Sequence, residues 1–290
     1  MKFLGRENIY SDYDNSKAVV VPVPYEKTTS YGKGTIKGPH AILKASGYVE
    51  HYDIEEDMLI SKIGISTLPA IKDINSPQRL YTEIKKVTCQ ILRDKKIPVY
   101  LGGEHTITAA IVSAFKTVHS SSFSILHIDA HSDIRDVYDG TKYSHACVMR
   151  RVYEMGIKIV SVGVRSQSYE EHEFIASVGA NGRSPLHIFY AHEIHNDKRW
   201  VEKVIDKLGK NIYITFDVDA VDPAYIRATG TPEPGGIFWC DIVKFFQTLA
   251  KSNKTLIGMD IVELAPNRYD KISDFICAKL ICKILGLLIK

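Results

Sequence analysis

The sequence predicts an α/β protein in which helices cover both faces of a mostly parallel sheet. Short apolar runs rich in β-branched residues alternate with amphipathic stretches along the chain of 290 residues. This alternation is typical of strand–helix–strand units, whose parallel strands are buried on both faces. No Pro/Gly/Ser-rich linker or shift in composition divides the chain. We therefore expect one domain over residues 1–290.

Eight segments have the apolar, β-branched character of strands. Residues 18–21 are apolar throughout, and Pro22 predicts the end of that strand because proline donates no ladder hydrogen bond. Residues 61–66 give the weakest of the eight signals. The other expected strands are residues 97–101, 123–128, 158–164, 186–190, 211–216 and 255–260.

Helices are expected between these strands. An amphipathic helix is predicted over residues 78–94, where apolar side chains recur at helical spacing (Leu80, Ile84, Val87 and Ile91). Pro39 suits the first turn of an earlier helix. Further helices are expected over residues 106–118, 148–155, 198–208, 241–251 and 270–288.

Composition narrows the class of protein. The net charge of +3 comes from intermixed acidic and basic residues, which does not favour a nucleic-acid partner. The five cysteines lack C-x-x-C spacing, which favours reduced thiols over a disulfide framework. Residues 1–7 carry charge too early for an export signal, and no uncharged apolar run is long enough to span a bilayer. We therefore expect a cytoplasmic protein with no membrane partner.

A D-x-H-x-D motif follows the expected strand at residues 123–128. Successive residues of an extended chain point to opposite sides, so Asp129, His131 and Asp133 can share one side. Three ionisable groups at a strand end repel one another or are costly to bury unless a cation neutralises them. A divalent metal does so, because carboxylate and imidazole both coordinate one. The alternative is a solvated acidic loop.

Two further motifs favour the metal site. Asp217 and Asp219, again two residues apart, follow the strand at residues 211–216, and His105 follows a Gly-Gly turn after another strand. Ligands in α/β proteins collect outside the carboxyl ends of the strands, where all these residues are expected. The set exceeds the needs of one metal and suits two metals that share bridging carboxylates. Its members are His105, Asp129, His131, Asp133, Asp217 and Asp219.

With these motifs in view, the chain resembles the ureohydrolase family, the arginases and agmatinases, and is most similar to agmatinases. The resemblance covers nearly the whole chain and implies a three-layer αβα sandwich on an eight-stranded parallel sheet. The motifs that carry it are Gly102-Gly-Glu-His-Thr106, Asp129-Ala-His-Ser-Asp133, Ser144-His145, Gly163-Val-Arg-Ser166, Phe216-Asp-Val-Asp-Ala-Val-Asp-Pro223, Thr229-Gly-Thr-Pro-Glu-Pro-Gly-Gly236 and Met259-Asp-Ile-Val-Glu263.

The resemblance implies two Mn²⁺ ions per subunit, bridged by Asp129 and Asp217. It assigns His105 and Asp133 to one ion and His131 and Asp219 to the other, each together with both bridging residues. Family members hydrolyse a guanidinium group through a metal-bridging hydroxide, which gives urea and an amine. They usually assemble as homo-oligomers, either trimers or hexamers.

Three residues resemble the catalytic groups of the family. Asp133 is expected to orient the hydroxide and pass its proton toward the leaving amine. His145 resembles the proton-relay histidine, a type of role worth roughly 10²–10⁴-fold in rate. Glu263 resembles the carboxylate that pairs with the guanidinium, for which a planar fork on a carboxylate is strong and directional. His127 is expected to be a core histidine, and Glu104 a structural residue.

The expected substrate is a small cationic guanidine, agmatine, which would give putrescine and urea in polyamine biosynthesis. Arg135 stands where arginases carry an asparagine that helps to bind the amino acid's carboxylate. Tyr143-Ser-His145 and Thr231-Pro-Glu-Pro234 resemble agmatinases. Arg227 departs from their Ala-Pro-Gly and is expected to reshape the pocket mouth.

Several alternatives remain open. N1-aminopropylagmatine, a larger precursor in the spermidine pathway, is the main alternative substrate, followed by arginine or another guanidino acid. A catalytically silent metal-binding relative is disfavoured, because a silent scaffold need not keep all six ligands together with His145 and Glu263. A binuclear metallophosphatase is less favoured still, because the site has no evident ring of Arg or Lys for phosphate.

Overall fold

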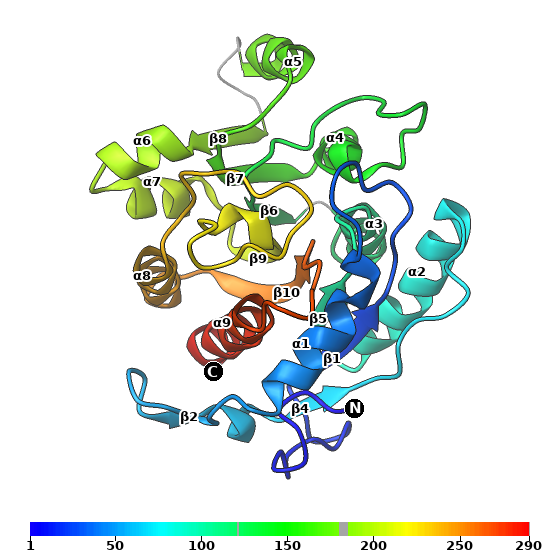
Figure 1. The fold of residues 1–290 in the computed structure, drawn as a ribbon, viewed down its shortest axis with the longest axis vertical. Coiled ribbons are helices and arrows are strands. Elements are labelled where there is room, and N and C mark those ends of the chain that lie inside the picture. Colours follow the sequence, from blue (N-terminus) through cyan, green and yellow to red (C-terminus); the bar gives the residue numbers. More distant parts are fainter. Residues whose placement is uncertain (121, 180–184, 290) are drawn as a thin grey trace.

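A parallel sheet of eight strands runs through the middle of the computed structural model, which describes residues 1–120, 122–179 and 185–289 (Figure 1). The order is β4-β1-β5-β10-β9-β6-β7-β8, and every pair is parallel. This confirms the predicted α/β class. The strands are β1 (Ala18–Val23), β4 (Ile65–Thr67), β5 (Ile97–Gly102), β6 (Phe123–Ile128), β7 (Lys158–Val164), β8 (Leu186–Tyr190), β9 (Asn211–Asp217) and β10 (Thr255–Val262). A separate short antiparallel pair is formed by β2 (Tyr52–Asp53) and β3 (Met58–Leu59).

Helices pack on both faces of the sheet (Figure 1). One layer contains α1 (Gly38–Ser46), α6 (Ala191–Asn196), α7 (Trp200–Lys207), α8 (Trp239–Ala250) and α9 (Ile272–Leu288). The opposite layer contains α2 (Pro77–Arg93), α3 (Ile107–His119), α4 (Val148–Glu154) and α5 (Tyr169–Gly179). Within the described residues, no helix is both long and apolar enough to span a bilayer.

The sheet separates two hydrophobic cores. In β6, Leu126 and Ile128 face the core beneath α8 and α9, whereas Ile125 faces the core beneath α3. This alternation follows from the two-residue period of a strand. Each fully buried aliphatic side chain contributes roughly 1.5–3 kcal/mol, so both layers hold the sheet firmly.

The expected end of the first strand was wrong. Strand β1 continues through Pro22 to Val23, because Pro22 lies beyond Val20↔Thr67, the last pair with β4. Its carbonyl accepts a hydrogen bond from the Ile71 N–H on that side. A residue's N–H and C=O point to the same side of a strand, so the missing donor of Pro22 costs no ladder bond.

Other segments also differ from the prediction. Residues 60–63 form a 3₁₀ turn, and Gly64 at φ +75° separates them from β4, which begins only at Ile65. Helices α5, of 11 residues, and α6, of 6 residues, were not expected.

Candidate metal centre

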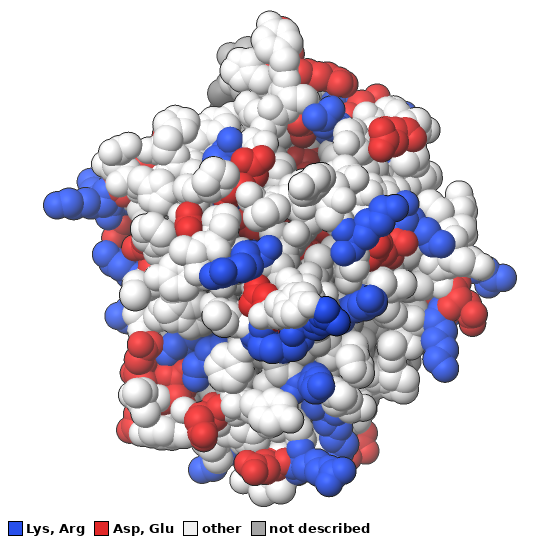
Figure 2. Space-filling view, viewed as in Figure 1, with Lys and Arg blue, Asp and Glu red and all other residues white. Residues whose placement is uncertain are grey.

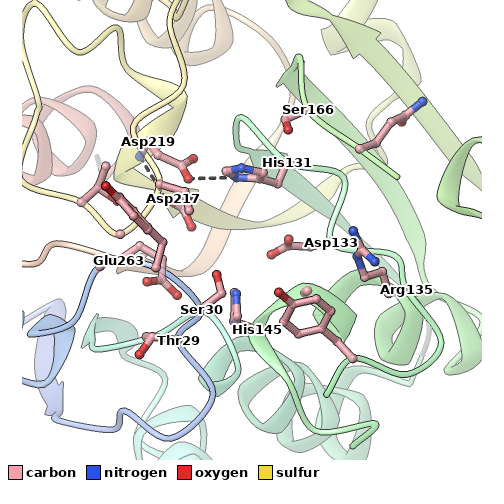
Figure 3. A pocket seen from close by; sticks show the side chains of 18 of the residues that line it. Thr29, Ser30, His131, Asp133, Arg135, His145, Ser166, Asp217, Asp219 and Glu263 are labelled. Carbon is pink, nitrogen blue, oxygen red and sulfur yellow. Dashed lines mark hydrogen bonds and ion pairs between the residues drawn. The ribbon is translucent and has the colours of Figure 1, made fainter. Parts of the chain in front are cut away.

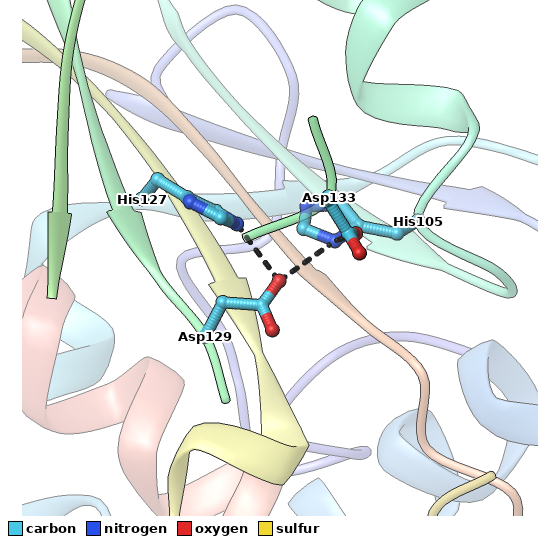
Figure 4. Close-up of side chains that lie close together, drawn as sticks. All are labelled: His105, His127, Asp129 and Asp133. Carbon is cyan, nitrogen blue, oxygen red and sulfur yellow. Dashed lines mark hydrogen bonds and ion pairs between the residues drawn. The ribbon is translucent and has the colours of Figure 1, made fainter. Parts of the chain in front are cut away.

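His105 meets three carboxylates at the carboxyl end of the central strands, and Figure 4 shows two of them, Asp129 and Asp133. It lies in the loop between β5 and α3. Its Nδ1 is 3.1 Å from Asp129 Oδ2, 3.0 Å from Asp133 Oδ2 and 3.4 Å from Asp217 Oδ2. All four residues follow or end neighbouring strands, because β5, β10, β9 and β6 are adjacent in the sheet.

His131 forms a second group with Asp219 and Asp129. Its Nδ1 is 3.0 Å from Asp219 Oδ2 (Figure 3) and 3.6 Å from Asp129 Oδ1. Asp129 therefore lies between the two histidines, with Oδ2 toward His105 and Oδ1 toward His131. Asp217 Oδ1 accepts a hydrogen bond from the Asp219 N–H, which joins the remaining two carboxylates.

The charges of this cluster perturb one another strongly. Burial and the neighbouring charges of Asp219 and Asp129 hold the pKa of Asp217 well above its ordinary value. Burial and the charge of Asp129 likewise raise the pKa of Asp133. Burial alone lowers the pKa of His131, but Asp219 and Asp129 outweigh it and raise that pKa to about 12. Protons thus take the place of positive charge in the cluster, which is the role a metal ion fills.

One buried atom shows that the residues fit a metal. His105 Nδ1 is buried and has no hydrogen bond of acceptable geometry in the described residues. Its Nε2 is 2.8 Å from Thr215 Oγ1, and the Thr215 hydroxyl donates to Asp260 Oδ1 at 2.6 Å. Because that hydroxyl proton is directed to Asp260, Nε2 carries the proton that Thr215 accepts. Burial lowers the pKa of His105, but Asp129, Asp133 and Asp217 outweigh it and raise that pKa well above its ordinary value, so Nδ1 carries a proton whose place a metal ion would take.

His127 is buried as expected but also touches the cluster. Its Nε2 is 2.8 Å from Asp129 Oδ2 (Figure 4), and its Nδ1 is 2.9 Å from Ser161 Oγ. With both ring nitrogens bonded, His127 orients the carboxylate of Asp129. Its place two residues before Asp129 on the same strand face was the signal that could have shown this contact.

Arg165, part of the Gly-Val-Arg-Ser motif, holds the loops that carry Asp219 and Glu233. Its guanidinium has five N–H groups, and all five donate to backbone carbonyls. Nη2 donates to Asp219 O at 2.6 Å and to Glu233 O at 2.8 Å, while Nε donates to Pro234 O at 3.0 Å. This planar fork fixes the turn that carries Asp219.

A cavity of about 200 Å³ opens onto the cluster (Figure 3). Asp133, His145 and Glu263 line it together with residues 29–32 of the loop after β1. Glu263 Oε1 accepts a hydrogen bond from the His105 N–H at 2.6 Å. The three predicted catalytic residues and four of the six expected ligands (His131, Asp133, Asp217 and Asp219) line this cavity, and the other two ligands, His105 and Asp129, are fully buried next to them.

Two of these residues have strained backbones. Asp133 has φ +50° and Glu263 has φ +65°, a region that side chains with a Cβ rarely adopt. Such conformations cost on the order of 1–3 kcal/mol and collect at functional sites. The surrounding packing therefore places both carboxylates against a local preference.

Arg227 does not shape the pocket, so that expectation was wrong. It is exposed and is absent from the cavity lining, whereas Ile226 and Ala228 on either side are buried. Its charge acts on Asp270 instead. Arg135 does line the cavity, with Nε 3.6 Å from Glu171 Oε2.

Over the face in Figure 2, acidic and basic side chains are interspersed among uncharged ones.

Comparison with known proteins places this geometry in a family. The sequence profile described as the Arginase family matches residues 16–286. The chain belongs to the arginase family. Within it, the N(1)-aminopropylagmatine ureohydrolase of Synechocystis sp. is 37% identical and aligns over 98% of this chain and 93% of its own length. The agmatinase of Pyrococcus horikoshii is 31% identical over 95% of this chain and 93% of its own.

A solved structure confirms the arginase-like fold. The crystal structure of agmatine ureohydrolase of Thermoplasma volcanium superposes with a TM-score of 0.85 at 30% identity. The match covers 97% of this chain and 92% of that one. The resemblance seen in the motifs therefore extends to the whole architecture.

Proposed function

We propose that this arginase-family enzyme is an agmatinase-type ureohydrolase that converts N1-aminopropylagmatine and water into spermidine and urea. The observation that carries the proposal is the position of two groups of His and Asp residues, which have Asp129 in common. They lie beside a cavity that Glu263 also lines. The relative at 37% identity supports the longer substrate, which the sequence alone ranked second. Agmatine is the second candidate, because agmatinases match at 31–32% identity.

The cavity also suits a longer cationic chain. Gln167 and Thr229 line it, and their side-chain oxygens Oε1 and Oγ1 are buried without a hydrogen-bond partner among the described residues. Both are acceptors for the N–H groups of an amine chain. These groups favour a substrate with several N–H donors over one with an α-carboxylate.

The cluster would hold two Mn²⁺ ions. His105, Asp129, Asp133 and Asp217 are the ligands proposed for one ion, and Asp129, His131, Asp217 and Asp219 those for the other. When bound, the ions lower the pKa of coordinated water from 15.7 toward about 7, which makes a nucleophile available at neutral pH.

The residues around the cavity bind the substrate and move protons. Burial and the charge of Glu104 raise the pKa of Glu263 well above its ordinary value, and a guanidinium beside Glu263 restores its ionised form. As the C–N bond breaks, the leaving nitrogen gains two protons and departs as an ammonium group. Both protons come from the attacking water, one carried by Asp133 and the other by His145.

We also propose one domain and a homo-oligomeric assembly for this chain. Residues 1–290 act as one ureohydrolase domain, since neighbouring central strands supply every proposed ligand. The protein forms a homo-oligomer, either a trimer or a hexamer.

Urea release by Mn²⁺-loaded protein tests the substrate, with N1-aminopropylagmatine, agmatine and arginine compared side by side. We expect the highest kcat/KM with N1-aminopropylagmatine and the lowest with arginine. Preference for agmatine would move the assignment to the second candidate, and preference for arginine would refute both. Asp133→Ala should abolish turnover while the circular dichroism spectrum stays native. Unchanged turnover in this variant would refute the metal-centre assignment.

A further inference from the structure

The loop after β1 is fastened to Glu104, which lies between the Gly-Gly turn and His105. Glu104 is fully buried, and its side-chain carboxylate accepts hydrogen bonds from several donors. Its Oε2 accepts from the Thr28 N–H at 2.7 Å, and its Oε1 accepts from the hydroxyls of Thr28 at 2.9 Å and Thr106 at 2.6 Å. A carboxylate that accepts several hydrogen bonds holds the loop in one conformation.

Gly103 makes this contact possible. A Cβ at this position would lie 2.0 Å from the carbonyl oxygen of Tyr25, which already accepts the Glu104 N–H at 2.9 Å. Only glycine lets the loop come so close to the β5 turn. The Gly-Gly of the motif therefore serves the β1 loop as well as His105.

Thr28 connects Glu104 to His145. Thr28 Oγ1 is 3.2 Å from His145 Nδ1 and accepts the His145 backbone N–H at 3.1 Å. A hydroxyl has a single proton, and the Thr28 proton is donated to the carboxylate of Glu104, the stronger acceptor. Toward His145, Thr28 can then only accept a hydrogen bond.

This requirement sets the tautomer of His145. Its Nδ1 must carry the proton, since two lone pairs facing each other at 3.2 Å would repel. Ser144 Oγ, 3.3 Å from the same nitrogen, can also accept from it. Nε2 is then the nitrogen with the lone pair, and the described residues show no partner for it. His145 lines the cavity, so the lone pair is available there.

We propose that Thr28 and Glu104 are positioning residues that hold His145 as the Nδ1–H tautomer, with Nε2 free to take up and release the proton for the leaving amine. This inference rests on the proposed function, in which His145 carries one of the two protons. During the transfer, the imidazolium keeps its Nδ1–H bonded to Thr28, whose own proton remains on Glu104. The wrong tautomer would present an N–H to the cavity and could not accept a proton at that atom.

Thr28→Val and Thr28→Ser test the proposal, because valine keeps the shape of threonine without the hydroxyl and serine keeps the hydroxyl. We expect Thr28→Val to lower kcat about 10–100-fold, part of the roughly 10²–10⁴-fold effect of acid–base catalysis. The KM should change less than about twofold, and Thr28→Ser should keep kcat within about threefold of wild type. Bound Mn²⁺, measured by mass spectrometry, should remain two per subunit.

A double-mutant cycle with His145→Ala separates positioning from general structure. If Thr28 acts through His145, Thr28→Val should lower kcat no further in the His145→Ala protein. The same 10–100-fold loss in that background, or wild-type kcat in Thr28→Val alone, would overturn the inference. Wild-type urea release decides the proposed function separately, and an inactive wild-type protein would overturn both.

Discussion

The His105 side and the His131 side of the metal centre offer similar donor atoms in different surroundings. The His105 side chain is fully buried, and its second ring nitrogen is bonded to Thr215. The His131 side chain is 25% exposed, and its second nitrogen lies 3.9 Å from a carboxylate oxygen of Glu233. The first side is fixed by side chains within the core, whereas the second is fixed largely through the backbone.

This difference teaches that one cluster can combine a rigid half with an accessible half. A buried ligand held by a second hydrogen bond binds metal more tightly, since its orientation is already set. An exposed ligand exchanges metal more readily and leaves room for substrate. We therefore expect the ion beside His105 to bind more tightly and to exchange more slowly than the ion beside His131.

The largest test of this comparison replaces each histidine with asparagine. His131→Asn should retain about one Mn²⁺ per subunit, because the His105 group does not need it. His105→Asn should lose the tight ion and also lower the melting temperature, since the substitution leaves Thr215 and three buried carboxylates without their partner. Metal content and thermal unfolding measure both effects. Equal metal loss and equal melting temperatures in the two variants would contradict the comparison.

A smaller effect on metal binding is expected from substitutions of Thr215, which hydrogen-bonds to His105, and of Arg165, which holds the turn that carries Asp219. Thr215→Val removes the acceptor for His105 Nε2–H, and Arg165→Lys replaces the planar fork that holds the Asp219 turn. Each change should weaken one ion by roughly 10–100-fold, the usual cost of losing an outer partner. Mn²⁺ titration followed by electron paramagnetic resonance should show the tight ion weakened in Thr215→Val and the loose ion weakened in Arg165→Lys. Weakening of the same ion in both variants would remove the distinction between the sides.

The smallest effect concerns pH and the metal-free protein. The raised pKa values of Asp133, Asp217 and Glu263 mean that the folded state binds protons which the unfolded chain releases above about pH 4. The raised pKa of His131 stabilises the fold fully below about 6.5, and this stabilisation is lost as pH rises toward 12. Both effects make the metal-free protein less stable as pH rises.

Mn²⁺ should therefore raise the melting temperature more at pH 8 than at pH 6, because the ions replace protons that are no longer bound. The lowered pKa of Asp129 does not alter this sign, since the stability it contributes is lost only in acid, below its ordinary value. Differential scanning fluorimetry with and without Mn²⁺ measures the shift. An equal gain at the two pH values would show that the cluster is already neutralised by its own hydrogen bonds.

The ligand positions could be predicted from sequence because they depend on local rules. Two-residue spacing places Asp129, His131 and Asp133 after one strand, and a parallel sheet brings the carboxyl ends of its strands together. The outer partners could not be predicted, since they join distant segments. His105 and Thr215 are 110 residues apart, and Thr28 and Glu104 are 76 apart. Neither pair has a spacing rule that would reveal it.

The error at Arg227 has a local physical cause. Its neighbours Ile226 and Ala228 are both buried, so the side chain between them points away from the protein interior. The place of Arg227 in a family motif suggested that its side chain lies at the pocket mouth. The alternation of buried and exposed residues instead determines the direction in which this side chain points. The same alternation is visible in the sequence as apolar–Arg–small, and it was the better guide.

The place of β10 in the sheet has a consequence for protein synthesis. Its residues, Thr255–Val262, come late in the chain but lie between β5 and β9 at the centre. Until the ribosome has released this segment, β4-β1-β5 and β9-β6-β7-β8 have no strand to join them. Pairing between segments so far apart in sequence forms slowly. A nascent chain that terminates before residue 262 therefore cannot close its sheet, and it presents unpaired strand edges to proteases and to other chains.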